Sequence, residues 1–221
     1  DFIIGEPKVK TNPNDFCTAF TTIGASELQE EVELNPFWQF AVSKMISGNP
    51  EEWGQQLHPA LKVHTKYGAI EEKEYMELLE RGKEFIPEEQ LRYISQYPQE
   101  FFEKAQKHRK QSYFEATGYK DTFDGFRAVL WANRADKRVI ITGVVLHDTW
   151  INSSDGIIRE EGNPMVGDAF LVIGQKKIEV AKKSFIPQIT FTNQSGPKQE
   201  TVDFSLFWQV YEALPQKFLD K

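Results

Sequence analysis

The clearest hydrophobic pattern runs through residues 138–150, RVIITGVVLHDTW, where β-branched residues lead into a His-Asp pair. Branched side chains suit the pleated surface of a strand better than a helix. Side chains alternate between the two faces of a strand, so Ile141, Val145 and His147 share one face. Gly143 interrupts the run, which indicates a bulge or a bend. We therefore predict a bent central strand that ends near His147.

The first half of the chain has mainly helical periodicity. Residues 1–26 mix Pro, Asn and Lys without a period and are interpreted as an N-terminal arm, and Ser26 is a suitable cap for a helix that follows. Strict alternation in ALKVHTKYG indicates a half-buried strand instead. The predicted helices start at residue 27, cover 36–48 and 49–58, and resume over 71–108 with breaks near Gly82, Pro87 and Pro98, while the predicted strand covers 61–67.

The second half changes character. Segments rich in Val, Ile, Phe, Tyr and Thr are separated by turn signals, which is typical of an antiparallel sheet. Helices followed by such a sheet predict an α+β fold, with a bent antiparallel sheet of about four to six strands wrapped around the N-terminal helices. The predicted strands cover 112–132, 137–151, 167–174 and 177–192.

A final helix is predicted within residues 196–221. Over 201–214 its aromatic side chains recur at i, i+3, i+4 and i+7, which makes one stripe that must be buried. We expect this helix to pack on a domain formed by residues 27–195, with a homodimer interface as the alternative. The stripe consists of Phe204, Phe207, Trp208 and Tyr211.

The order of a helix containing GNPEEW, the segment LHPALKVHTKYGAIEEKEYM and a meander of strands resembles the nuclear-transport-factor-2-like superfamily, also called the SnoaL-like or cystatin-like cone fold. The resemblance spans about residues 35–190. It implies a cone with an apolar pocket, used by members as an isomerase, dehydratase or cyclase site, as a ligand receptor, or as an assembly scaffold. The matching residues are Leu57, His58, Pro59, Tyr67, Gly68, Ile70 and Glu71.

Composition restricts the classes of function. With 221 residues, of which 40% are hydrophobic, the chain can form one sizeable core. A net charge of -7 argues against a dedicated nucleic-acid surface. No stretch approaches the roughly 20 apolar residues of a membrane span, so no insertion into a membrane is expected. The chain begins at Asp1 without a methionine, which leaves two locations open: the cytoplasm, or export with an N-terminal segment removed.

Two residues are candidates for acid-base chemistry. His147 is able to act as a general base on a pocket wall, because histidine titrates near neutral pH. The alternative is a structural histidine bonded to backbone. Asp168 faces the region of His147 if residues 138–151 and 167–174 pair as a hairpin, and otherwise caps the start of a strand.

Other chemistry has less support. Cys17 is the one cysteine, which excludes an internal disulfide, and as a nucleophile it sits in the predicted arm with no base assigned. Histidines lack metal-ligand spacing and no phosphate-binding loop is present, so no metal and no cofactor are expected. Several aromatic residues are interpreted as core residues that can also face a ligand, namely Trp38, Tyr67, Phe126, Trp131 and Phe170.

Two functions from different classes follow. The first is a pocket that binds a small apolar molecule, with or without acid-base chemistry. The second is a non-catalytic domain that binds a protein partner in a membrane-anchored secretion or conjugation complex. The apolar strand that ends in His147 favours the first, and the missing methionine favours the second.

Overall fold

The computed structural model divides the chain into two compact units. Residues 10–115 form the first, here called the helical unit, and residues 1–9 with 116–221 form the second, here called the sheet unit. The division after residue 115 differs from the single domain predicted for residues 27–195. The α+β class is confirmed. The structure describes residues 2–8, 10, 16–49, 54–82, 97–114, 122–151, 157–158, 162–179, 185–192 and 199–203.

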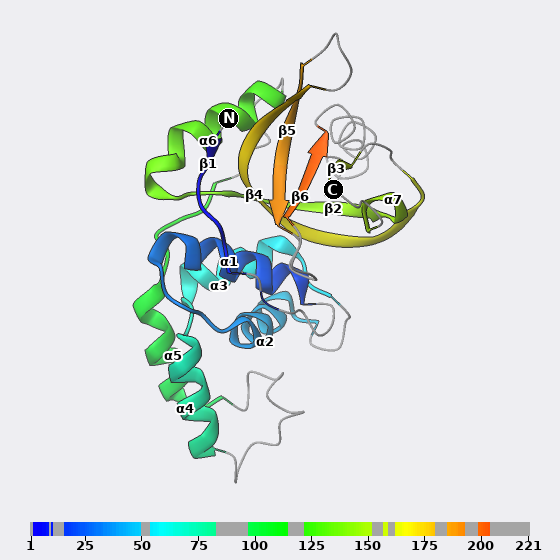
Figure 1. Cartoon of the computed structure of the whole chain (residues 1–221). Helices are drawn as coiled ribbons and strands as arrows, with labels where there is room; N and C mark the ends of the chain where they lie inside the picture. The colour runs from blue at the N-terminus through cyan, green and yellow to red at the C-terminus, as the bar shows by residue number, and fades with distance from the viewer. Residues whose placement is uncertain are drawn as a thin grey trace. The chain divides into compact units, whose positions relative to one another are not determined.

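The described part of the helical unit consists of helices around an aromatic core (Figure 1). Trp38 is fully buried at its centre and meets Tyr97 edge to face, with ring centroids 5.3 Å apart. Phe101 packs against Tyr97 at 4.9 Å. The elements are α1 (Cys17–Glu30), α2 (Pro36–Ser47), α3 (Leu57–Lys66), α4 (Glu72–Gly82), α5 (Gln99–Ala105) and the short 3₁₀ helix η3 (Gln106–His108).

Helix α2 has the boundaries that its sequence predicts. The side chain of Asn35 accepts a hydrogen bond from the backbone N–H of Trp38 at 2.8 Å, which caps the first turn, and Pro36 occupies the first helical position. Gly48 ends the helix in the left-handed conformation that glycine adopts without strain. The predicted helix over 36–48 is therefore confirmed.

The sheet unit is organised around one long strand, β4 (Pro164–Glu179), which curves strongly in Figure 1. β2 (Ile140–His147) and β5 (Phe185–Thr192) pair with it antiparallel, so the pairing considered for residues 138–151 and 167–174 is present, although the central strand is β4 rather than β2. β1 (Phe2–Ile3) also pairs with β4, and β6 (Gln199–Asp203) joins β5 to β3 (Ile157–Ile158). The helical elements are α6 (Thr122–Asn133), the 3₁₀ helix η4 (Arg134–Asp136) and α7 (Asp148–Ile151).

Three predicted elements are wrong. The strand predicted at 61–67 lies mostly in α3, whose buried residues Ala60, Val63 and His64 recur at helical spacing as well. The predicted arm over 1–26 contains most of α1, where Thr18, Thr21 and Thr22 hide the helical pattern. The strand predicted over 112–132 includes α6.

The prediction of a C-terminal helix is corrected at its start. Residues 199–203 form β6, so the helix predicted from residue 201 begins in a strand. Thr201 and Val202 are β-branched, which suits a strand. The aromatic stripe at 204–211 lies outside the described residues. No described helix has both the length and the apolar character needed to cross a membrane.

Substitutions at two glycines test how closely the backbone packs in the helical unit. Gly68 has φ +92°, and a Cβ atom there would lie 2.0 Å from the carbonyl oxygen of Ala105. Gly48 has φ +74°, but nothing lies within 4 Å of its Cβ position. Gly68→Ala should lower the free energy of unfolding by about 3 kcal/mol or more, and Gly48→Ala by about 1 kcal/mol, in urea titrations. Equal losses of unfolding free energy in the two variants would contradict the close approach of Gly68 to Ala105.

Candidate functional site

His147, the predicted base, lies at the end of β2 as expected but is buried, with 5% of its surface exposed. Its Nδ1 is 3.1 Å from the carbonyl oxygen of Gly162, so that nitrogen carries the proton and donates. This contact ties the end of β2 to the segment just before β4. The structure therefore places His147 in the setting of a structural histidine.

The face of β2 that carries His147 also differs from the prediction. Residues of even number, such as Thr142 and Val144, are buried, whereas Ile141 and Val145 are half-buried. The register shifts between Leu146 and His147, which is the signature of a bulge. Because a bulge inserts one residue, it interrupts the alternation and leaves two consecutive residues buried at the strand end.

Asp168 lies on β4, and the structure does not bring it to His147. His147 pairs with Pro164, whereas Asp168 pairs with Val144. That difference corresponds to roughly 10 to 13 Å along the strands. Asp168 Oδ1 accepts a hydrogen bond from the backbone N–H of Ala169 at 2.7 Å. Asp168 thus lies within β4, and not at the start of a strand, where the alternative had placed it.

The predicted ligand-binding aromatic residues divide between the two units. Trp38 and Phe170 are each at least 99% buried, so they are core residues. Tyr67 follows α3 and is half-buried beside Phe102. Trp131 on α6 is 52% exposed, and the guanidinium carbon of Arg134 lies 3.6 Å from its ring centroid. The remaining residue, Phe126, belongs to α6, but its side chain lies outside the described residues.

Cys17 occupies a position that sequence reasoning missed. It is the first residue of α1, half-buried, and its Sγ lies 3.8 Å from Thr18 Oγ1. Phe16 stands at the N-cap and has no side-chain acceptor for the first backbone N–H groups. Such groups carry a partial positive charge, which favours a thiolate at a helix N-terminus.

The start of α1 is held firmly. Thr18 Oγ1 donates to the carbonyl oxygen of Gln55 at 3.0 Å, which ties the segment before α3 to the residue next to Cys17. The Phe16 ring packs edge to face against Phe40, with centroids 4.3 Å apart. A signal was present in the sequence, because Phe16, Ala19, Phe20 and Ile23 have helical spacing and all four are buried.

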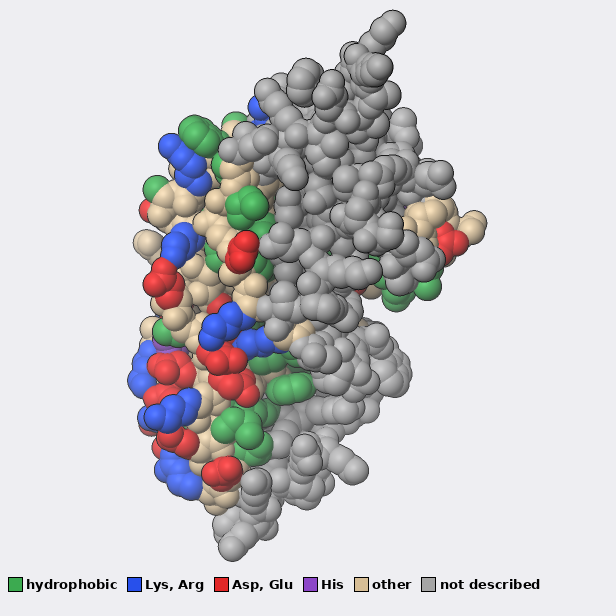
Figure 2. All heavy atoms as spheres, viewed as in Figure 1, with side chains coloured by type: hydrophobic (Ala, Val, Ile, Leu, Met, Phe, Trp, Pro, Cys, Tyr) green, Lys and Arg blue, Asp and Glu red, His purple; other side chains and the backbone are tan. Residues whose placement is uncertain are grey.

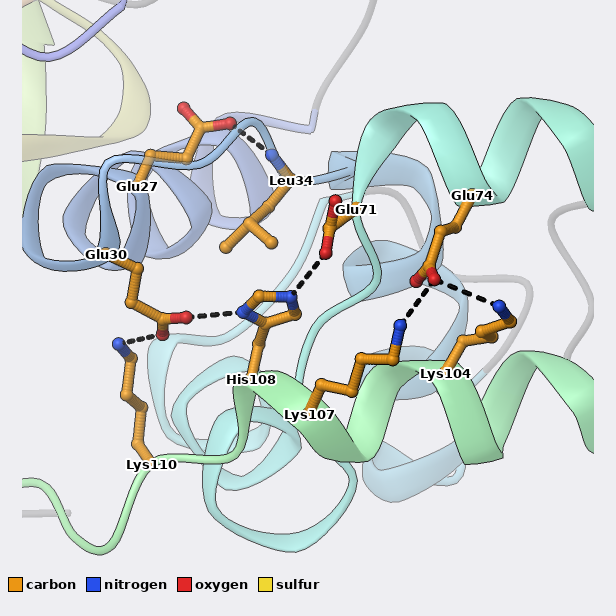
Figure 3. Close-up of polar contacts among 9 residues, drawn as sticks. All are labelled: Glu27, Glu30, Leu34, Glu71, Glu74, Lys104, Lys107, His108 and Lys110. Atoms are coloured by element: carbon orange, nitrogen blue, oxygen red, sulfur yellow. Dashed lines mark hydrogen bonds and ion pairs between the residues drawn. The ribbon is translucent and has the colours of Figure 1, made fainter.

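The C-terminal end of α1 carries a polar network (Figure 3). His108 points between two carboxylates: its Nδ1 bonds Glu30, and its Nε2 lies 3.3 Å from Glu71 Oε1. The ammonium of Lys110 also bonds Glu30. Burial alone raises the pKa of Glu30, but the hydrogen bonds from Lys110 and His108 outweigh it and lower the pKa below its usual value.

Neighbouring ion pairs join α4 to the segment that contains α5 and η3. Glu74 accepts from Lys104 at 3.0 Å and from Lys107 at 2.5 Å. On the described part of the face seen in Figure 2, acidic and basic side chains are interspersed. Within the described ranges, no three His, Cys, Asp or Glu residues are grouped to hold a metal ion.

Comparisons with known proteins find a similar fold among solved structures. No family model matches the chain, and a search of curated proteins finds no match. Among solved structures, the chain is similar to xylellain, a cysteine protease from Xylella fastidiosa, with 15% sequence identity and a TM-score of 0.66. The match covers 92% of this chain and 79% of xylellain. At this identity the likeness concerns the fold. The resemblance to the nuclear-transport-factor-2-like superfamily stays a prediction.

The Glu30 network should appear in the pH dependence of stability. Because its pKa is lowered in the folded state, Glu30 stabilises the fold above the ordinary carboxyl pKa of 4.5, and this contribution is lost as pH falls below it. Glu30→Gln should therefore cost about 1 kcal/mol at pH 7 and progressively less in acid. Glu77→Gln is a control, because the Lys73–Glu77 pair is exposed and 3.9 Å apart. A loss for Glu30→Gln that does not change with pH would contradict this role.

Proposed function

We propose that this chain is a hydrolase of peptide or related acyl bonds with Cys17 as its nucleophile. The observation that carries the proposal is the position of Cys17, half-buried as the first residue of α1, where the backbone N–H groups of the first turn have no acceptor within the helix. Similarity of fold to xylellain, itself a cysteine protease, supports the same chemistry.

In this reaction the Cys17 thiolate attacks the carbonyl carbon of the substrate. Backbone N–H groups at the start of α1 are suited to stabilise the oxyanion that forms, because they have no helical acceptor. The C–N bond breaks, the amine leaves with the proton that the Cys17 thiol gave up, and a thioester between the acyl group and Cys17 remains. Water then hydrolyses the thioester and restores the thiol.

A second candidate is a protein that binds peptides without turnover. The observation that favours it concerns the general base. In papain-like cysteine proteases a histidine has this role. His147 is buried and its Nδ1 is engaged by Gly162. A histidine held in this way supports a structural role more than proton transfer. Cys17 then serves as a binding group and not as a catalyst.

The single cysteine makes a direct test possible, because alkylation of the protein reports on Cys17 alone. Iodoacetamide should label the folded chain at pH 7 at least about tenfold faster than the same chain unfolded in guanidinium, because the helix start favours the thiolate. The unfolded chain is the matched control. Equal rates would remove Cys17 as an activated nucleophile.

Turnover distinguishes the two candidates. Cleavage of a fluorogenic peptide library by the wild type, abolished in Cys17→Ser, is the result expected for the hydrolase. Labelling of Cys17 by a peptidyl vinyl sulfone without any cleavage would support the binding protein instead. If neither cleavage nor labelling occurs in folded protein, both candidates are excluded.

A further inference from the structure

A buried polar pair joins α1 to α3 in the interior of the helical unit. Ser26 on α1 and His64 on α3 each expose only 4% of their surface. Ser26 Oγ lies 3.1 Å from His64 Nδ1, so the two side chains share one hydrogen bond. The pair is distinct from Cys17, which stands at the opposite end of α1.

The second ring nitrogen of His64 has no acceptor. Nε2 is buried and makes no hydrogen bond in the structure. A neutral imidazole carries only one N–H group, whereas the protonated ring carries two and a positive charge. Protonation would therefore place a charge and an additional donor in a site where only Ser26 is available as a partner.

The charged groups near His64 do not offset the cost of protonating its buried ring. Burial is the main cause that lowers the pKa of His64, to about 3. Lys110, which follows η3 and donates its backbone N–H to the carbonyl oxygen of His64 at 2.9 Å, lowers it further. Glu30 on α1 acts in the opposite direction, but its carboxylate is already bound by Lys110 and His108.

We propose that Ser26 and His64 form an acid-sensitive latch, which holds α1 against α3 while the ring is neutral and releases this contact on acidification. The inference goes beyond the proposed function and does not depend on it. The latch sets a lower pH limit for the folded helical unit, whatever Cys17 does.

The pH range of the latch follows from linkage. In the unfolded chain a histidine binds its proton near pH 6.5, whereas folded His64 stays neutral to about pH 3. Its stabilising contribution is thus complete above about pH 6.5 and is lost as pH falls towards 3. Glu30 and Glu74 have lowered pKa values, so they lose their contributions only below 4.5. Glu27, whose pKa is raised by burial, has the opposite effect on stability.

The test compares the folding equilibrium constants of wild type, His64→Gln and His58→Gln, from urea titrations at pH 6.5 and 5. Glutamine keeps a hydrogen-bonding group beside Ser26 but does not titrate, and His58 is an exposed control. The constant of the wild type should fall at least about tenfold more than that of His64→Gln over this range. His58→Gln should follow the wild type. Equal falls in wild type and His64→Gln would overturn the latch.

A measurement on the wild type covers the case in which His64→Gln does not fold. Ring ¹³C and ¹⁵N chemical shifts report the charge of His64 in the intact chain. The ring should keep the shifts of a neutral imidazole at pH 5. A folded protein in which His64 is protonated at pH 5 would also overturn the proposal.

Discussion

The burial of α1 is the constraint on which the helical unit depends. Residues 18–28 of this helix are all buried, although five of them have polar side chains. A buried polar group costs free energy unless it finds a hydrogen-bond partner. The surrounding elements therefore supply partners: the segment before α3 accepts from Thr18, and α3 contacts Ser26. Glu27 accepts from the backbone N–H of Leu34 and from Lys10.

This constraint gives the two ends of α1 different chemistry. At the first residue, Cys17 lies beside the backbone N–H groups of the first turn, which have no acceptor within the helix. At the last turn, Glu30 forms hydrogen bonds with Lys110 and His108, which belong to a segment about 80 residues away in sequence. The N-terminal end is thus suited to a reactive anion, while the C-terminal end is a structural junction.

Local signals in the sequence predict part of this architecture correctly. Asn35, Pro36 and Gly48 define α2 because caps act within one turn. The hairpin of β2 and β4 follows from β-branched runs. Long-range contacts decide the rest: the pattern around Val63 fits both a strand and a helix, and only packing against α1 and α2 selects α3. Cys17 was misplaced for a similar reason, since threonines weaken the helical signal of a helix that is stabilised by burial.

Strand β4 brings together parts of the chain that are made at very different times. Its partners include β1 at the N-terminus, β2 in the middle and β5 near the C-terminus. During synthesis residues 10–115 are complete before β4 exists, so the helical unit is free to fold first. Phe2 and Ile3 are synthesised before the helical unit, whereas their partners Gln175 and Gly174 are synthesised after it. Closing this contact over such a sequence separation is an intrinsically slow step, so β1 is among the last of the described segments to reach its native place.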